Sequence, residues 1–381
     1  MHEPADSLLI LFCVIVAVPF IAKWIKLPII VIEIIIGIIL GYLGWIKPHP
    51  TLDFFASFGL TYLLFLAGLE VDFRFIRKHL KRTVGIAIAS ISMPFLAGFL
   101  VGKWLGIQPV LFGTIFCTTS LGVVLPMTKE FKEREQFVQI LLGSVILVDI
   151  LSMFLLAFSL SLEDGNLSAT FIYSIFAVLT LFLIPWIINL NKVHEWVEKI
   201  LSNKIYFERE VRFSFALIFI LSAITESFGF HSIIGAFIAG LIIYEITPQA
   251  SRVDEKLKGF GYGFFIPLFF ILVGTRVDLI AVFQNADHIF SLVVVIAAAV
   301  VSKWISVCIV SKIEGLCLGE SLAMGAMHTA RLSLIIAAAE IARKIGIIDG
   351  NIFSTLVLLA VITSTLAPTI SRWILHHTSS K

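Results

Sequence analysis

Long apolar runs follow one another along almost the whole chain and are separated by short polar segments. A helix rises about 1.5 Å per residue, so roughly 20 apolar residues cross a hydrocarbon core about 30 Å thick. Runs of about 17 to 25 residues therefore predict an all-α polytopic membrane protein with about 13 transmembrane helices. The predicted spans are residues 7–23, 28–46, 54–73, 83–102, 109–127, 137–160, 168–190, 211–228, 231–247, 259–275, 288–311, 321–342 and 351–375.

The composition agrees with this fold class. Of the 381 residues, 59% are hydrophobic and only 14% are charged, and the mean hydropathy is +1.02; soluble domains have about 25% charged residues. The net charge of +2 is small and the basic residues are scattered, so we expect no nucleic-acid partner. The four cysteines are isolated, which predicts neither a disulfide framework nor a metal cluster. No signal-type segment precedes the first run, which we expect to be retained as a helix.

The distribution of lysine and arginine predicts the orientation in the membrane. Cytoplasmic loops are enriched in these residues. With thirteen spans and the N-terminus outside, most lysines and arginines fall in cytoplasmic segments. An even number of spans would place them on both sides of the membrane and remove this excess on the cytoplasmic side. We therefore expect the N-terminus outside, the C-terminus inside, and a short cytoplasmic tail at 376–381. The lysines and arginines left outside are Lys47, Lys103, Arg276, Arg343 and Lys344.

A short motif that occurs twice indicates an internal repeat. The pattern Gly-x-x-Val-Asp ends the third predicted span at 68–72 and the tenth at 274–278. Because the two spans lie an odd number of crossings apart, the two copies must have opposite orientations. This predicts a six-plus-six inverted-topology repeat joined by a linker helix at 168–190, an architecture of many secondary transporters.

The sixth predicted span carries one acidic residue, Asp149, close to its midpoint. A carboxylate near the bilayer centre costs roughly 2.5 to 3.5 kcal/mol, which makes it a candidate functional group. The neighbouring fifth span contains Thr118, Thr119 and Ser120, followed by Pro126, and these residues disfavour a regular helix. The twelfth span has a similarly irregular half at 325–333. We expect both spans to be broken.

Unwound carbonyls and hydroxyls are hard oxygen ligands that suit a dehydrated alkali cation. The predicted site for a cation and a proton is therefore Asp149 with Thr118, Thr119 and Ser120, and Asp149 and Thr119 are the expected cation ligands. No cofactor is expected, because Na⁺ or K⁺ and H⁺ are the transported species.

These motifs, together with a lysine at position 303 inside the eleventh span, resemble the monovalent cation:proton antiporter-2 family. That family includes sodium/proton antiporters and potassium-efflux carriers. The resemblance covers residues 7–375 and implies a homodimer with crossed broken helices. It also implies that a core part, about 83–160 and 288–375, moves against a dimerisation part, about 7–73 and 211–279.

The same resemblance implies roles for single residues. Asp149 would carry the proton and the cation in turn, Thr119 and Ser120 would lie at the crossing of the broken helices, and Lys303 would be the intramembrane basic residue. Electrogenic members have two adjacent acids, whereas here the first is Val148. A single carboxylate favours electroneutral one-for-one exchange and leaves Asp149 itself as the expected partner of Lys303.

Three intramembrane charges are predicted to support the site. Lys303 is expected to stabilise the core through an ion pair, with a proton-linked switch as the alternative. Arg331 is expected to anchor helix ends and carbonyls. Glu33 lies deep in the presumed dimerisation part and is a candidate for lining the cation path, whereas the lone His328 is expected to be a packing residue.

The sequence thus predicts a secondary antiporter of the cell inner membrane that exchanges protons for Na⁺ or K⁺. A gated potassium efflux channel is one alternative, and an anion or organic-acid symporter on the same scaffold is another. A separate cytoplasmic regulator is compatible with the sequence. No nucleophile with an oriented base and no phosphate-binding glycine loop is found, so an enzyme is not expected.

Overall fold

The computed structural model is entirely helical in its regular structure over the residues that it describes. The predicted linker helix at 168–190 lies outside the described residues. The described residues are 4–25, 27–46, 49–71, 78–128, 131, 133–162, 208–228, 232–246 and 252–378.

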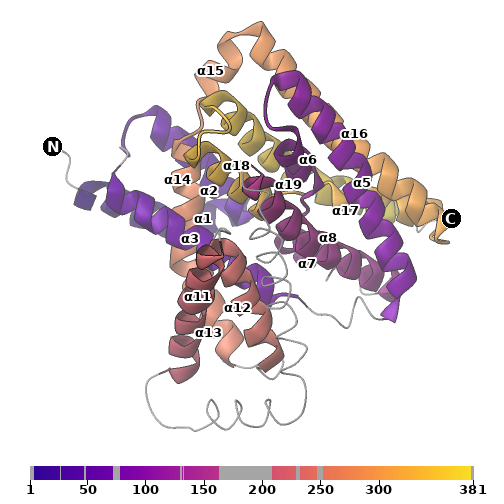
Figure 1. The fold of residues 1–381 in the computed structure, drawn as a ribbon, viewed down its shortest axis with the longest axis horizontal. Helices are drawn as coiled ribbons and strands as arrows, with labels where there is room; N and C mark the ends of the chain where they lie inside the picture. Colours follow the sequence, from indigo (N-terminus) through magenta and orange to yellow (C-terminus); the bar gives the residue numbers. More distant parts are fainter. Residues whose placement is uncertain are drawn as a thin grey trace. The chain divides into compact units, whose positions relative to one another are not determined.

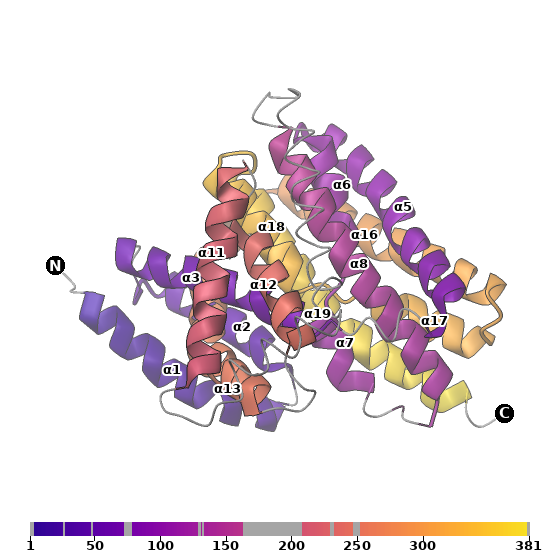
Figure 2. The same ribbon diagram turned by 60° about the horizontal axis from the view of Figure 1, so that its bottom comes forward.

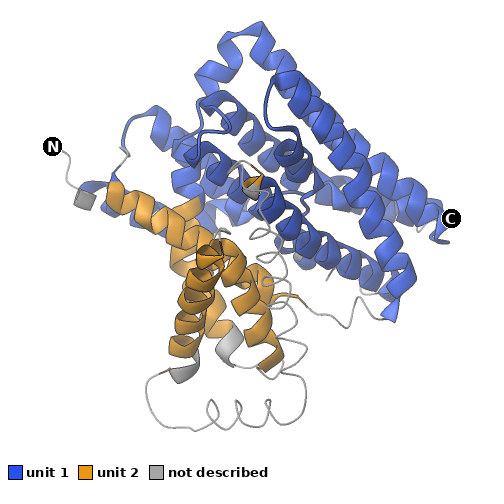
Figure 3. Ribbon diagram, in the orientation of Figure 1, with its two compact units in different colours: residues 1–49, 72–159, 270–381 blue, residues 50–71, 160–269 orange. Residues whose placement is uncertain are grey.

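The chain divides into two compact units (Figure 3). Unit 1 comprises Met1–His49, Asp72–Ser159 and Phe270–Lys381, and unit 2 comprises Pro50–Val71 and Leu160–Phe269. These bounds differ from those of the predicted core and dimerisation parts, whose division by function stays a prediction.

The helices of both units are labelled in Figure 1. Unit 1 contains α1 (Pro4–Ile25), α2 (Ile29–Tyr42), α5 (Leu80–Leu105), α6 (Pro109–Cys117), α7 (Leu121–Thr128), α8 (Glu135–Ser161), α15 (Leu279–Gln284), α16 (Ala286–Ile313), α17 (Leu318–His328), α18 (Ser333–Lys344) and α19 (Gly350–Thr378). Unit 2 contains α3 (Pro50–Leu69), α11 (Arg209–Ser227), α12 (Ser232–Ile246), α13 (Arg252–Phe260), the π-helix η2 (Gly261–Phe265) and the start of α14 (Ile266–Thr275).

The prediction of an all-α polytopic membrane protein is confirmed. Within the described residues, 8 helical stretches are long and apolar enough to cross a membrane. Shorter apolar helices occur at Ile29–Tyr42, Pro109–Leu125 and Ser232–Ile246. The number of spans, about 13, stays a prediction.

A tight hairpin of α5 and α6 positions the first broken helix. Gly106, at φ +71°, ends α5 in the left-handed conformation that glycine adopts without strain. Gln108 then caps α6 by accepting a hydrogen bond from the backbone N–H of Leu111. A Cβ added at Gly98 of α5 would lie 2.7 Å from the carbonyl oxygen of Phe112, so the two helices touch backbone to backbone. The long helix α16 also packs along α5, and Figures 1 and 2 show these two helices next to each other.

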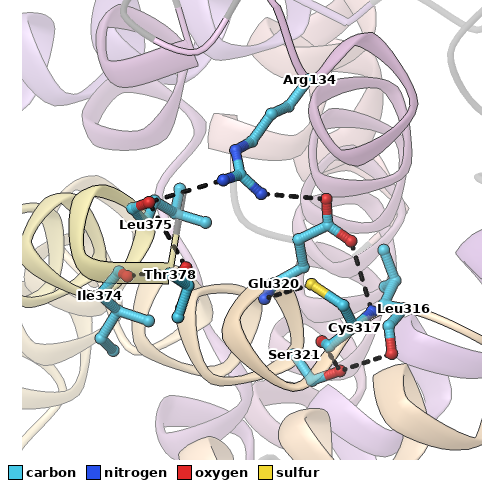
Figure 4. A network of polar contacts seen from close by, with 8 residues as sticks. All are labelled: Arg134, Leu316, Cys317, Glu320, Ser321, Ile374, Leu375 and Thr378. Atoms are coloured by element: carbon cyan, nitrogen blue, oxygen red, sulfur yellow. Dashed lines mark hydrogen bonds and ion pairs between the residues drawn. The ribbon is translucent and has the colours of Figure 1, made fainter. Parts of the chain in front are cut away.

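A polar network joins the ends of three helices of unit 1 (Figure 4). Arg134, directly before α8, donates to Glu320 Oε1 of α17 at 3.3 Å and to the carbonyl oxygen of Leu375 in α19 at 3.5 Å. Glu320 also completes a capping box with Cys317 at the start of α17. The network links the start of α8, the helix that carries Asp149, to α17 and α19.

Aromatic rings fill the core of unit 2. Phe58 of α3 lies edge-on to Phe265 of η2, with ring centroids 4.5 Å apart. The neighbouring Tyr62 is fully buried and its hydroxyl donates to the carbonyl oxygen of Leu257 at 3.0 Å. These contacts fix α3 against α13 and η2.

The predicted repeat is visible in the order of the helices. A long helix, a helix in two pieces and a second long helix occur first as α5, α6 with α7, and α8, and again as α16, α17 with α18, and α19.

Two close helix crossings repeat in the same way. Gly68 of α3 meets Gly240 of α12 in unit 2, and Gly37 of α2 meets Gly274 of α14 in unit 1. A Cβ on any of the four would lie 2.0 to 2.3 Å from the carbonyl oxygen three residues before the partner glycine. The third helix of each predicted half therefore crosses the second helix of the other half through the same contact.

Candidate ion-binding site

The first broken helix is interrupted where the hydroxyl residues predict. Helical structure ends at Cys117 and resumes at Leu121, leaving Thr118, Thr119 and Ser120 unwound. The Thr118 hydroxyl donates to the carbonyl oxygen of Ile115 at 2.9 Å. The backbone N–H of Thr118 donates to the same carbonyl at 3.4 Å, so Thr118 caps the end of α6 with both groups.

The second broken helix is interrupted between α17 and α18. Residues 329–332 are not helical, and Leu332 before α18 has φ −144° and ψ −71°. The Thr329 hydroxyl donates to the carbonyl oxygen of Ala326 at 2.7 Å. The Thr119 hydroxyl of the first break lies 3.5 Å from the carbonyl oxygen of His328, to which it donates a long hydrogen bond. The two breaks therefore lie against each other.

Two buried cations hold the carboxyl end of α6. Lys303 of α16 and Arg331 of the second break are both fully buried. The Lys303 ammonium group donates to the carbonyl oxygens of Cys117 and, at 2.7 Å, Thr118. Arg331 Nε donates to the Thr118 carbonyl at 3.2 Å, and its Nη2 donates to the carbonyl oxygen of Ala299 at 2.8 Å. A helix carboxyl end carries partial negative charge, which these two cations neutralise.

Asp149 lies at the opposite side of the same break. Its Oδ2 accepts a hydrogen bond from the backbone N–H of Leu121, the first residue of α7, at 3.3 Å. A helix amino end carries partial positive charge and favours a carboxylate. The adjacent Ser120 is 2% exposed, and its hydroxyl oxygen has no hydrogen-bond partner among the described residues. Val148 is fully buried in the core.

The arrangement can bind a small cation. Asp149, which caps the start of α7, can supply one negative charge, and the unwound residues Thr119 and Ser120 carry hydroxyl oxygens. Buried polar atoms normally have partners, and the Ser120 hydroxyl oxygen, which has none among the described residues, is available to a ligand. The carbonyl of Thr118 is already bound by Lys303 and Arg331. Whether Thr118 contacts the cation stays a prediction.

The sodium/hydrogen exchanger family of transmembrane proteins matches residues 8–377. The chain belongs to this family. Probable Na⁺/H⁺ antiporter 3 of Methanocaldococcus jannaschii is 31% identical over 96% of this chain and 95% of that protein. The Na⁺/H⁺–K⁺ antiporter GerN of Bacillus cereus is 25% identical over 91% and 89% of the two chains. The solved structure of the sodium proton antiporter MjNhaP1 from M. jannaschii has a TM-score of 0.63 at 16% identity, over 96% and 95% of the chains.

Membership of the sodium/hydrogen exchanger family confirms the predicted resemblance to cation:proton antiporters and makes the chain a transporter rather than an enzyme. The likeness to MjNhaP1 confirms the fold class. The assignment of Asp149, Thr119 and Ser120 to the ion site stays a prediction.

The other predicted charges have different surroundings in this exchanger. Arg331 anchors carbonyls, as expected, and so does Lys303. The pairing of Lys303 with Asp149 stays a prediction. Glu33 of α2 is 3% exposed, and none of the hydrogen bonds described for unit 1 connects its side chain to either helix break. Its place on the cation path also stays a prediction.

Sequence reasoning missed the surroundings of His328. The ring lies between Ser90 of α5 and Ser144 of α8, at 3.1 and 3.0 Å. These partners are 238 and 184 residues away along the chain. The only available signal was the position of a polar ring next to the predicted break.

The contacts of Lys303 predict a loss of stability when it is replaced. Lys303→Met is expected to destabilise the exchanger by about 2 kcal/mol, because the Cys117 carbonyl loses its charged donor while Arg331 still serves the Thr118 carbonyl. Thermal unfolding of the detergent-purified protein measures this change. Lys312→Met, at an exposed position of the same helix, is the control and is expected to unfold like the wild type. Equal stability of both variants would contradict the anchoring role.

Proposed function

We propose that this protein is a secondary antiporter that exchanges one proton for one Na⁺ or K⁺ at Asp149. The observation that carries the proposal is the position of Asp149 at the amino end of α7, where it accepts from the N–H of Leu121, the residue that follows the buried Ser120. A carboxylate in this position can hold a proton or a monovalent cation, but not both.

Exchange follows from competition for the carboxylate. A charged carboxylate without a bound proton or cation is costly to move through an apolar environment. The protein therefore changes readily between the outward-open and inward-open states only when a proton or a cation neutralises Asp149. Because Val148 replaces a second acid, each cycle moves one positive charge in each direction and is electroneutral.

The choice of cation is supported by the relatives. One is named a Na⁺/H⁺ antiporter and another a Na⁺/H⁺–K⁺ antiporter. These names do not favour a gated channel or an anion symporter. Hydroxyl oxygens such as those of Thr119 and Ser120 can bind either Na⁺ or K⁺.

The arrangement in the cell is part of the proposal. We infer a homodimer in the cell inner membrane, with the N-terminus outside and the C-terminus in the cytoplasm. Residues 83–160 and 288–375 form the moving core, and residues 7–73 and 211–279 form the dimerisation part.

Transport by the purified protein tests the proposal. In acid-loaded liposomes that contain a pH dye, adding Na⁺, K⁺ or Li⁺ outside is expected to make the interior more alkaline for the cation that is transported. For Na⁺ and Li⁺, the rate is measured again with the membrane voltage set by K⁺ and valinomycin, and an electroneutral exchanger keeps the same rate. Cation flux without proton movement would contradict the antiporter and favour the gated channel. An exchange rate that depends on voltage would contradict one-for-one exchange.

A further inference from the structure

The His328 ring connects three helices at the second break. It is fully buried at the last residue of α17. Nδ1 lies 3.1 Å from Ser90 Oγ of α5, and Nε2 lies 3.0 Å from Ser144 Oγ of α8. The helix that carries Asp149 is thus tied to the helix that ends at the break.

The hydrogen bonds are all satisfied in one form of the ring. The single hydroxyl proton of Ser144 can be donated to the carbonyl oxygen of Leu141, 3.0 Å away, and Ser144 then accepts from the histidine. Nε2 therefore carries the proton, and Nδ1 accepts from the hydroxyl of Ser90. In this neutral tautomer both ring nitrogens of His328 are satisfied, which fixes the ring in one orientation.

The backbone of the same residue belongs to the ion site. The His328 carbonyl oxygen accepts the long hydrogen bond from Thr119 at 3.5 Å. The ring and the carbonyl of one residue thus link Ser144, five residues before Asp149 on α8, to the hydroxyl run of the first break. A shift of the ring would move this carbonyl relative to Thr119.

We propose that His328 is a positioning residue that sets the distance between the two helix breaks and thereby the affinity of the cation site. The inference rests on the proposed function and names a residue on which cation binding depends. His328 itself carries neither the proton nor the cation. It acts by holding α17 against α5 and α8, so that the carbonyl and hydroxyl oxygens of the breaks stay at the spacing that a bound cation needs.

Substitutions of His328 separate this role from simple packing. His328→Leu removes both hydrogen bonds and is expected to raise the apparent KM for the transported cation about tenfold, with Vmax changed less than about threefold. His328→Gln keeps an N–H at the position of Nε2 and is expected to restore KM to within about threefold of the wild type. Ser371→Ala removes another buried hydrogen bond to α17, to the Ala323 carbonyl, and is expected to leave KM unchanged.

The measurements use the same liposomes as the exchange assay, with a second readout in detergent. A bound cation raises the Tm of the folded protein, so the increase on adding NaCl or KCl reports binding without transport. If His328→Leu does not fold, Ser144→Ala tests the same contact with the ring in place and is expected to raise KM about threefold.

The outcomes are distinct from those that test the proposed function. A wild-type protein that does not exchange cations for protons contradicts the proposed function, whereas a smaller cation-dependent rise in Tm for His328→Leu still supports the positioning role. A wild-type KM and a wild-type rise in Tm in His328→Leu would overturn the inference. So would equal effects of the leucine and glutamine variants, or an equal rise in KM in Ser371→Ala.

Discussion

Asp149→Asn is expected to reduce cation-dependent proton exchange to the background rate, a loss of at least about a hundredfold. The asparagine side chain has the same shape and can still accept the hydrogen bond from the Leu121 N–H. It cannot take up a proton or balance the charge of a cation. The variant therefore keeps the cap of α7 and the fold while it loses the exchange chemistry.

Proton movement in acid-loaded liposomes, with wild-type and variant protein at equal density, measures this loss. Asp287→Asn, at an exposed position near the start of α16, is the matched control and is expected to transport at the wild-type rate. Circular dichroism and gel filtration establish that the Asp149 variant is folded. A folded Asp149→Asn protein that still exchanges would remove Asp149 from its assigned role.

Gly240→Ala is expected to destabilise the protein by about 3 kcal/mol or more, because the added methyl group has no space in the crossing of α3 and α12. A Cβ at this position would lie 2.0 Å from the Phe65 carbonyl oxygen. The obstacle is backbone rather than a flexible side chain, so the helices themselves must separate.

The matched control is Gly259→Ala in α13, where an added Cβ meets nothing within 4 Å. Alanine is the better helix former by up to about 1 kcal/mol, so this variant is expected to be at least as stable as the wild type. Tm and the yield of monodisperse protein in detergent measure both effects. Equal Tm values for the two alanine variants would show that the crossing tolerates a methyl group.

The sequence predicts the helical fold and both helix breaks well, because each depends on local residue chemistry. Apolar runs set the length of the helices, and the hydroxyl run at Thr118, Thr119 and Ser120 competes with the helix for backbone hydrogen bonds. The π-helix at Gly261–Phe265 was missed inside the predicted span 259–275. The pair of glycines in that segment was the available signal.

The partners of the buried polar residues could not be predicted. Lys303 and His328 contact residues more than 180 positions away in the sequence, and hydrophobic periodicity contains no information about such pairs. A lysine in an apolar run suggests a carboxylate partner, yet a broken helix also offers carbonyl oxygens with partial negative charge. Which of these a buried cation binds depends on the packing of distant helices.

The repeat divides the charges of the proposed ion site unequally between its two halves. Asp149 belongs to the first half, whereas Lys303 and Arg331 belong to the second. In inverted-repeat carriers the outward-open and inward-open states arise as the two halves exchange conformations. Chemically identical halves would give these two states equal energy. Here the halves differ, and we expect one of the two states, outward-open or inward-open, to be more populated at rest. Forward and reverse exchange then reach half-saturation at different cation concentrations, even without a gradient.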